Sequence, residues 1–214
     1  MRHRRAKGKE EVFERDARYM VPGDPKEQKG HWHDLFGNKN PIWLEIGSGK
    51  GQFLIELAKS MPDYNFLACE GIDDVYVRIL EKCEAENITN LLLIPCFIDH
   101  SADYFESGEI DRIFINFCDP WPKKRHQKRR LTDGSKLREY AGILGPDHFI
   151  QFKTDNDELF NFTLEQINEL GLGIEAMSRD LLNSEFEKDN IHTEYEDKFE
   201  GFGKNINYVL IKIK

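Results

Sequence analysis

The sequence contains few cysteines and no long hydrophobic run. Its four cysteines, in 214 residues, form no Cys-x-x-Cys pair, which argues against a zinc knuckle and a small disulfide scaffold. The longest apolar runs, such as Leu91–Ile94, are far too short to cross a bilayer. We therefore expect reduced thiols in a cytoplasmic protein without a membrane segment.

A signal peptide and a metal site are also missing. The basic start, Met1–Arg5, is followed by Glu10 and Glu11, where a signal peptide needs an apolar stretch. The group His31-Trp32-His33-Asp34 has no further His/Cys cluster at ligand spacing. We expect neither secretion nor a bound metal.

Positive charge is scarce overall but locally dense. The net charge of -9 argues against a nucleic-acid partner, yet acids dominate only from Asp155 onward, whereas the N-terminus and Lys123–Arg130 are basic. Local potential, not the total charge, decides whether a phosphate backbone is attracted. An RNA partner is therefore compatible with the composition.

The length and the apolar pattern predict one α/β domain over residues 1–214. Alternating strands and helices favour a mostly parallel sheet. The predicted strands are Pro41–Leu44, Asn65–Cys69, Asn90–Ile94, Arg112–Phe117, His148–Phe152, Ile174–Ser178 and Tyr208–Ile213. The predicted helices are Gln52–Lys59, Asp73–Glu86, Ser135–Ile143 and Glu158–Leu170.

Residues 1–40 are predicted to form a basic N-terminal extension ahead of this fold. Arg2, Arg4, Arg5, Lys7 and Lys9 could bind phosphates or only keep the terminus soluble.

A glycine-rich loop, Glu45–Gly51, follows the first predicted strand and precedes a helix, an order typical of nucleotide-cofactor sites. Gln52 stands where the dinucleotide fingerprint needs its third glycine, which disfavours NAD. Glu70 ends the second strand about twenty residues after the loop, where an acid can accept hydrogen bonds from ribose hydroxyls. A solvated acid at a strand end is the alternative.

The stretch Asn116–Pro122 combines an acid with a stiff turn. Asp119 follows a buried strand and precedes Pro120, and the two prolines of this stretch restrict the backbone. Ligands bind at the carboxyl ends of strands in open α/β sheets. The block Lys123–Arg130 follows at once, so the pattern indicates chemistry on a polyanion. An ordinary strand exit with a solvated charge run remains the alternative.

Lys153–Asn156 is a second polar group at a strand end, which could also be simple helix capping, because Thr, Asp and Asn are preferred N-caps. Cys118 could act as a nucleophile, but its place on a buried strand favours an inert thiol. The acidic segment Thr193–Glu196 would ordinarily be a solvated loop.

Together these motifs resemble the bacterial tRNA (guanine-N7-)-methyltransferases over nearly the whole chain. The resemblance rests on Glu45–Gly51, Asn116–Arg130, Phe152–Asn156 and Thr193–Glu196, in that order. It implies a Rossmann-like class I methyltransferase fold with a seven-stranded, mostly parallel sheet, an antiparallel last strand and helices on both faces. It also implies methylation, from S-adenosylmethionine, of N7 of a guanine in the tRNA variable loop.

The resemblance further implies roles for individual residues. Asp119 matches the catalytic residue and is also one of the cofactor-binding positions, which are Glu45, Gly47, Gly49, Glu70, Phe97 and Asp119. Substrate binding is implied for Lys123, Asp155, Thr193, Glu194, Tyr195 and Glu196. RNA contacts are implied for Arg125, His126, Gln127, Lys128, Arg129 and Arg130.

One position departs from the family, which usually has an aspartate near the adenine where this chain has Phe97. Phe97 can stack on the adenine and offer its backbone N–H, or Asp99 takes over by a shift of register. Two rival functions are methylation of an exocyclic amine, suggested by Asp119-Pro120-Trp121, and non-catalytic RNA binding on a degenerate fold. The chain is compatible with a monomer or a homodimer.

Overall fold

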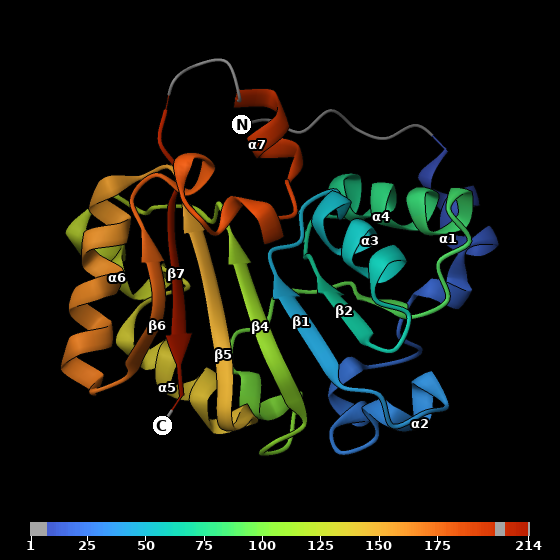
Figure 1. Cartoon of the computed structure of the whole chain (residues 1–214). Coiled ribbons are helices and arrows are strands. Elements are labelled where there is room, and N and C mark those ends of the chain that lie inside the picture. The colour runs from blue at the N-terminus through green and yellow to red at the C-terminus, as the bar shows by residue number, and fades with distance from the viewer. Residues whose placement is uncertain (1–7, 200–203, 214) are drawn as a thin grey trace.

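A seven-stranded sheet in the order β3-β2-β1-β4-β5-β7-β6 forms the centre of the computed structural model, which describes residues 8–199 and 204–213 (Figure 1). Neighbours from β3 to β5 pair in parallel, and β7 runs antiparallel to both β5 and β6. The strands are β1 Ile42–Ile46, β2 Asn65–Cys69, β3 Leu91–Ile94, β4 Ile110–Asn116, β5 Leu144–Thr154, β6 Gly173–Ser178 and β7 Asn207–Lys212. The predicted mostly parallel sheet with an antiparallel last strand is confirmed.

Helices cover both faces of the sheet, as the resemblance implied (Figure 1). Because side chains alternate between the two faces of a strand, β1 sends Ile42, Leu44 and Ile46 into a core shared with α5 and α6. Apolar side chains of α3 and α4 pack on the opposite face, against Phe66 and Phe114. The helices are α1 Lys9–Arg15, α2 Trp32–Phe36, α3 Gln52–Ser60, α4 Asp73–Ala85, α5 Gly134–Ile143, α6 Asp157–Leu170 and α7 Glu194–Phe199.

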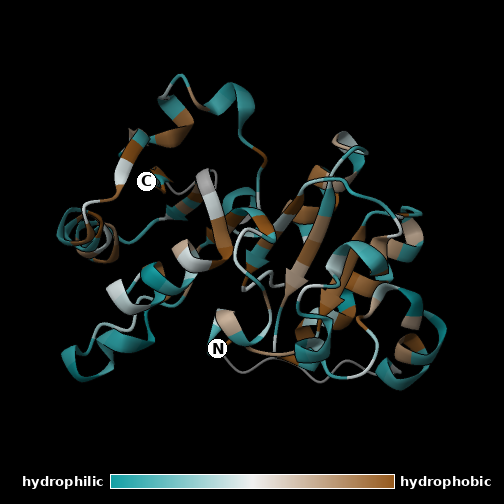
Figure 2. Cartoon of the chain, turned by 90° about the horizontal axis from the view of Figure 1, so that it is seen from below, coloured by the Kyte–Doolittle hydropathy of each residue, from teal (hydrophilic) through white to brown (hydrophobic). Residues whose placement is uncertain are grey.

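Hydropathy follows this layering. Figure 2 shows hydrophobic residues gathered on the strands and on the helix sides turned toward them, with hydrophilic residues on the outer loops. Short 3₁₀ turns complete the connections, at Ala17–Tyr19, Pro25–Gln28, Ser101–Asp103, Lys124–Arg129, Leu181–Asn183 and Glu187–Asp189.

The segment before β1 is packed onto the fold, although the sequence pattern predicts an extension ahead of it. Trp32 has no exposed surface, donates a hydrogen bond from Nε1 to the Tyr104 carbonyl at 2.9 Å, and contacts the Phe105 ring. Val21 donates its backbone N–H to the Leu93 carbonyl at the edge strand β3. Lys9 forms an ion pair with Asp73 at the start of α4. Arg2, Arg4, Arg5 and Lys7 lie outside the described residues.

Two elements differ from the predicted pattern for local reasons. Strand β5 starts at Leu144 rather than His148, because Leu144 pairs with Ile110 and an irregularity in the register follows before Arg112. Helix α7 replaces the expected acidic loop, since Thr193 and Glu196 exchange hydrogen bonds at its start. Such a reciprocal exchange is a capping box, which stabilises a helix N-terminus.

We predict that Trp32→Ala lowers the free energy of unfolding by about 3–5 kcal/mol, because it leaves a cavity and removes the hydrogen bond to Tyr104. Urea denaturation measures this loss. Trp32→Phe keeps a ring against Phe105 and should retain most of the stability. A loss below about 0.5 kcal/mol for Trp32→Ala, which is typical of surface sites, would mean that the segment before β1 is not part of the folded core.

Candidate active site

The glycine loop after β1 turns sharply and leaves open space at its tip. Gly47 and Gly49 have positive φ values of 79° and 57°, which favour glycine, and an added Cβ at either would meet nothing within 4 Å. Gly51 is crowded instead, since a Cβ there would approach Ile79 to 2.9 Å. The backbone of this loop is therefore exposed to a ligand at Gly47 and Gly49 and packed on α4 at Gly51.

Glu45, at the end of β1, is a buried acid with spare hydrogen-bonding capacity. It is 2% exposed, and its Oε1 accepts from Asn116 Nδ2 at 2.7 Å. Burial raises the Glu45 pKa from 4.5 to about 8, although Asn116 and Lys153 oppose the shift. Glu45 Oε2 and Asn116 Oδ1 are buried without a hydrogen-bond partner. Two acceptor oxygens thus lie beside the glycine loop, suited to a donor-rich cationic group.

Glu70, at the end of β2, joins this loop to the next strand end. Its Oε2 accepts from Gly49 N at 3.2 Å and its Oε1 from Ile72 N at 3.0 Å. Phe97 lies against Gly71 so closely that a Cβ there would come within 2.4 Å of the ring, yet the Phe97 side chain is 64% exposed. An acid that bonds to the glycine loop is therefore followed directly in the chain by Gly71, against which the exposed Phe97 ring lies. Asp99 is exposed, and its backbone oxygen accepts from Lys136.

The loop after β4 presents Asp119 between two residues with unusual backbone geometry. Phe117 and Trp121 have φ values of 50° and 40°, which non-glycine residues rarely adopt. Asp119 itself is exposed. Arg130 fixes the turn by donating to the carbonyls of Pro120 and Trp121, at 3.0 and 3.3 Å. Backbone strain of this kind persists where surrounding contacts enforce it, and it is frequent at functional sites.

The basic segment Lys123–Arg130 is folded as a turn of 3₁₀ helix with its charges turned outward. Lys123, Arg125, Lys128 and Arg129 are exposed, and within the described ranges no residue of this segment has a carboxylate ion-pair partner. The Trp121 ring is held inside the segment by the Arg129 guanidinium at 5.0 Å and by the edge of His126. Gln127 is half-buried. Arg130 differs from the others, because it braces the Asp119 turn.

Asp155 and Tyr195 meet at the end of β5. Asp155 Oδ2 accepts from the Tyr195 hydroxyl at 2.8 Å and from Lys204 Nζ at 2.5 Å. The capping role that the sequence left open belongs to Asn156, whose Oδ1 accepts from Leu159 N. The Tyr195 ring stacks on Phe117, with centroids 4.6 Å apart. The loop after β4, the end of β5 and the start of α7 are thus in contact.

The Thr193–Glu196 segment divides into buried and outward-facing members. Thr193 and Glu196 are 7% and 2% exposed and bond to each other. Glu194 accepts from Gln52 N, directly after the glycine loop, and from Lys82 Nζ. Tyr195 is 37% exposed. The predicted substrate segment is therefore beside the glycine loop, but only part of it reaches the surface.

Sequence reasoning placed Lys153 in a polar group at a strand end but missed its burial and its partner. The lysine has no exposed surface and forms an ion pair with Glu196 at 2.8 Å. The available signals were a lysine at the buried end of a strand and the Thr-x-x-Glu pattern of a capping box at Thr193–Glu196. Neither signal reveals that the two segments meet.

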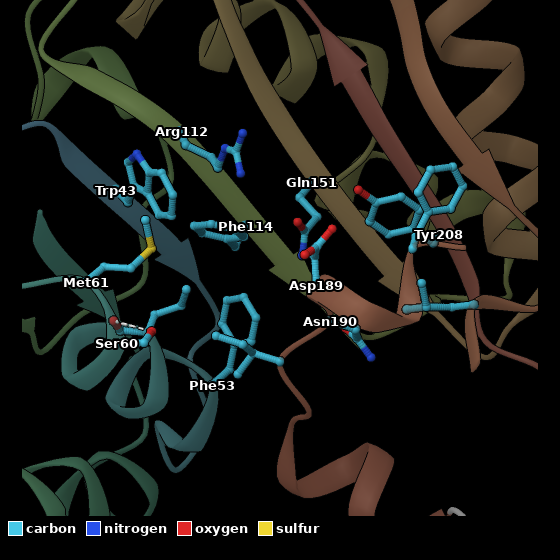
Figure 3. Close-up of a pocket in the computed structure, with 14 residues that line it drawn as sticks. Trp43, Phe53, Ser60, Met61, Arg112, Phe114, Gln151, Asp189, Asn190 and Tyr208 are labelled. Atoms are coloured by element: carbon cyan, nitrogen blue, oxygen red, sulfur yellow. Dashed lines mark hydrogen bonds between the residues drawn. The ribbon is translucent and has the colours of Figure 1, made fainter. Parts of the chain in front are cut away.

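A cavity of about 420 Å³ lies on the sheet face away from α5 and α6 (Figure 3). Its walls come from β1, β4, β5, β7, α3 and the segment before α7, and its labelled side chains include Trp43, Phe53, Arg112, Gln151 and Asn190. None of the predicted site residues lines it. The strand-end cluster, which carries the acids and the glycine loop, is therefore the candidate active site.

Burial raises the Cys118 pKa to about 12, so the thiolate needed for a cysteine nucleophile would be scarce near neutral pH. Across residues 8–199 and 204–213, no three His, Cys, Asp or Glu side chains gather as metal ligands. No helix within these ranges has the length and apolar character required to cross a membrane.

The solved structures most relevant to this arrangement are methyltransferases. The 16S rRNA methyltransferase KamB superposes with a TM-score of 0.65 at 12% identity, covering 86% of this chain and 93% of that one. A 16S rRNA (adenine(1408)-N(1))-methyltransferase from Catenulisporales acidiphilia, solved with its cosubstrate SAM, gives 0.60 at 14% identity, with 91% and 93% covered. The fold is that of the class I S-adenosylmethionine-dependent methyltransferases.

Sequence comparison identifies the family to which the chain belongs within this class. Residues 39–209 match the family described as "Putative methyltransferase". The tRNA (guanine-N(7)-)-methyltransferase of Clostridioides difficile (strain 630) is 45% identical over 206 residues, covering 96% of each chain. The enzyme of the same name from Lacticaseibacillus casei (strain BL23) is 44% identical over 195 residues, covering 91% of each. This chain belongs to the tRNA (guanine-N7-)-methyltransferase family.

We predict that Glu45 makes the stability of the ligand-free protein depend on pH. Because its folded pKa of about 8 exceeds the ordinary 4.5, its contribution is fully present below the lower value and declines as pH rises through the higher one. Glu45→Gln cannot titrate, so its free energy of unfolding should fall less between about pH 5 and pH 8. Urea denaturation across this range measures the difference.

His192 provides the matched control for this titration. Its hydrogen bond to Glu187 raises the His192 pKa above 6.5, so its contribution is present below that value and is lost as pH rises through the raised one. His192→Gln should therefore change only the part of the curve near and above pH 6.5. Equally steep curves for Glu45→Gln and the unmodified protein would show that Glu45 is ionised in the fold.

Proposed function

We propose that this protein transfers the methyl group of S-adenosylmethionine to N7 of a guanine in the variable loop of tRNA. The observation that carries this proposal is the position of exposed Asp119. It lies between the strand ends of the candidate cofactor site and a basic segment that forms no carboxylate ion pair within the part of the chain that the structure describes. Membership of the tRNA (guanine-N7-)-methyltransferase family supports the activity. The protein would work in the cytoplasm, with every site residue supplied by one chain.

S-adenosylmethionine, when bound, supplies an electrophilic methyl group on a sulfonium centre. The residues around the glycine loop fit such a molecule. The orphaned acceptors Glu45 Oε2 and Asn116 Oδ1 suit its ammonium group, Glu70 suits its ribose hydroxyls, and the exposed face of Phe97 suits its adenine. The backbone at Gly47 and Gly49 leaves room for close approach.

Guanine N7 carries an in-plane lone pair, so its methylation needs no general base. The demand is alignment of the two reactants, which can contribute about 7–11 kcal/mol, together with stabilisation of the positive charge that appears on the purine. Asp119 and Asp155 are the carboxylates available for hydrogen bonds from the guanine edge. We infer that they offset this charge, while Lys123 holds a nearby phosphate.

The aromatic surface at the site supports a base flipped out of the RNA. Tyr195 stacks on Phe117 and remains 37% exposed, and side chains of this kind hold unstacked bases. Glu194 and Tyr195 are the members of Thr193–Glu196 suited to direct substrate contact. Buried Thr193 and Glu196 would instead shape the turn that carries them.

The rival functions have weaker support. If the protein methylated an exocyclic amine, the aromatic residue after the proline would stack on the target base. The Trp121 ring instead packs with Arg129 and His126 inside the basic segment. A non-catalytic RNA-binding role would not require the buried Glu45–Asn116 pair or the Glu70 contact with the glycine loop.

The proposed function predicts that the purified protein, incubated with labelled S-adenosylmethionine and bulk tRNA, produces 7-methylguanosine. Asp119→Ala and Asp119→Asn should fold normally and bind tRNA, but lose about 10²–10³-fold in rate, because each removes a preorganised charge from the transition state. Nucleoside analysis identifies the product, and single-turnover kinetics measure the rate.

Each possible failure of this experiment has its own meaning. Another labelled nucleoside would refute the choice of guanine N7, and complete absence of label would refute the enzymatic proposal. If Asp119→Asn methylated within about threefold of the unmodified protein, its charge would not contribute and only a positioning role would remain.

The basic segment predicts a salt-dependent affinity for tRNA. If Arg125, Lys128 and Arg129 each neutralise a phosphate, replacing all three by glutamine should weaken binding and flatten its dependence on salt, because fewer counterions are released. Fluorescence anisotropy with labelled tRNA at several salt concentrations measures the slope. Lys59→Gln, on the exposed side of α3, is the control. An unchanged slope in the triple variant would identify the segment as an ordinary solvated surface.

A further inference from the structure

Lys153 is a buried cation whose side-chain hydrogen bonds, among the described residues, all go to residues 190–196. Its side chain is 0% exposed, and Nζ donates to Glu196 Oε2 at 2.8 Å, Asn190 Oδ1 at 3.1 Å and the Ile191 carbonyl at 3.0 Å. An ammonium group has three donors, so this set satisfies all of them. The Phe53 ring of α3 lies 5.0 Å from the same nitrogen.

The segment held by Lys153 leads directly to the candidate active site. Thr193 and Glu196 close the capping box at the start of α7, with N–H donors at 2.8 and 3.1 Å from their acceptors. From this turn, Glu194 accepts from Gln52 N at 3.2 Å. Tyr195 reaches Asp155 and Phe117. One helical turn therefore contacts the start of α3 directly after the glycine loop, the loop that carries Asp119 and the end of β5.

Within the described residues, this turn has few other attachments to the sheet. Lys82 Nζ from α4 and Gln52 N from α3 both donate to Glu194, and these two contacts are only partly buried. Asn190, which bonds to Lys153, also donates to Glu196 Oε1 at 3.1 Å and forms part of the cavity wall in Figure 3. The Lys153 ammonium is thus the deepest point of attachment between the turn and the sheet.

We propose that Lys153 is a positioning residue for methyl transfer, holding the Thr193–Glu196 turn against the glycine loop and the Asp119 loop through Glu196 and Asn190. The inference rests on the proposed function for its catalytic meaning. The tether itself is a property of the fold. Lys153 touches no reacting atom, so its effect on the reaction passes through Glu194 and Tyr195.

The energetics of a buried ion pair favour a positioning role for Lys153 over a role in stabilising the fold alone. Burying two charges is expensive, and apolar pairs of similar volume often replace a buried ion pair without loss of stability. Burial lowers the Lys153 pKa, while Glu196, Glu45 and Glu187 oppose that shift. Lys153 in turn opposes the raised pKa of Glu45. The charge of Lys153 therefore acts both on Glu45, the proposed cofactor acid, and on the proposed substrate segment.

The test compares Lys153→Met, the double variant Lys153→Met/Glu196→Gln, and the control Lys59→Met. The single variant leaves Glu196 buried without its cation, which should destabilise the fold. The double variant removes both charges, and glutamine can still close the capping box. Lys59 is a partly exposed lysine that pairs with Glu56 and Glu86 on the surface, so its removal matches the loss of charge without touching the tether.

Hydrogen exchange is the readout that does not depend on activity. In the folded double variant, the amides of 193–197 and of Gln52 should exchange at least about tenfold faster, while the amides of β4 keep their protection. For the reaction, kcat/KM for tRNA should fall by up to about 10²-fold even where stability is restored, because a displacement of about 1 Å can have that effect. Lys59→Met should match the unmodified protein in both measurements.

Results that would refute the role of Lys153 differ from those that would refute the proposed function. If the double variant regains stability and also has unchanged exchange at 193–197 and an unchanged kcat/KM, the ion pair only supports folding and the proposal is wrong. Global acceleration of exchange without a local excess would have the same meaning. If the unmodified protein fails to methylate tRNA, the proposed function falls, and the exchange measurement still decides whether Lys153 tethers the turn.

Discussion

Parallel strands all end at the same edge of a sheet, and this constraint assembles the site from distant parts of the sequence. Strands β1, β2, β4 and β5 run in one direction, so Glu45, Glu70, Asp119 and Asp155 leave the sheet on one side. No local interaction brings them together. Any change that reversed or shifted one strand would separate an acid from the others, because a slip of one residue also exchanges the two faces.

The same constraint brings several acids close together, and these acids differ in their burial and in their hydrogen-bond or ion-pair partners. Glu45 is buried, and its pKa is raised to about 8. The carboxylate of Glu70 accepts from two backbone N–H groups, and Glu196 is paired with Lys153. Asp119 alone of these four is exposed. The acid next to the basic segment is therefore the one that is accessible at the surface.

Much of the sheet could be predicted from local pattern, because apolar runs and glycine turns mark strand ends directly. Glu70 and Asp119 were identifiable for the same reason, since each follows a strand at a recognisable spacing. The packing of Trp32 and the Lys153–Glu196 pair could not be predicted, because each joins segments separated by tens of residues through tertiary contact. The Thr193–Glu196 turn was intermediate: its acidity suggested a solvated loop, although the sequence also contains a capping-box pattern there, which indicates a helix start and was not used.

The strained loop after β4 shows how these parts depend on one another. Phe117 and Trp121 can hold positive φ values only if other contacts offset their strain. Phe117 is held by the Tyr195 ring and by the Lys153 carbonyl, which accepts its N–H at 2.9 Å, while Arg130 bonds to the carbonyls of Pro120 and Trp121. The Thr193–Glu196 turn and the basic segment thus each support one side of the Asp119 loop. A displacement of either one would therefore change the geometry of the loop that presents Asp119.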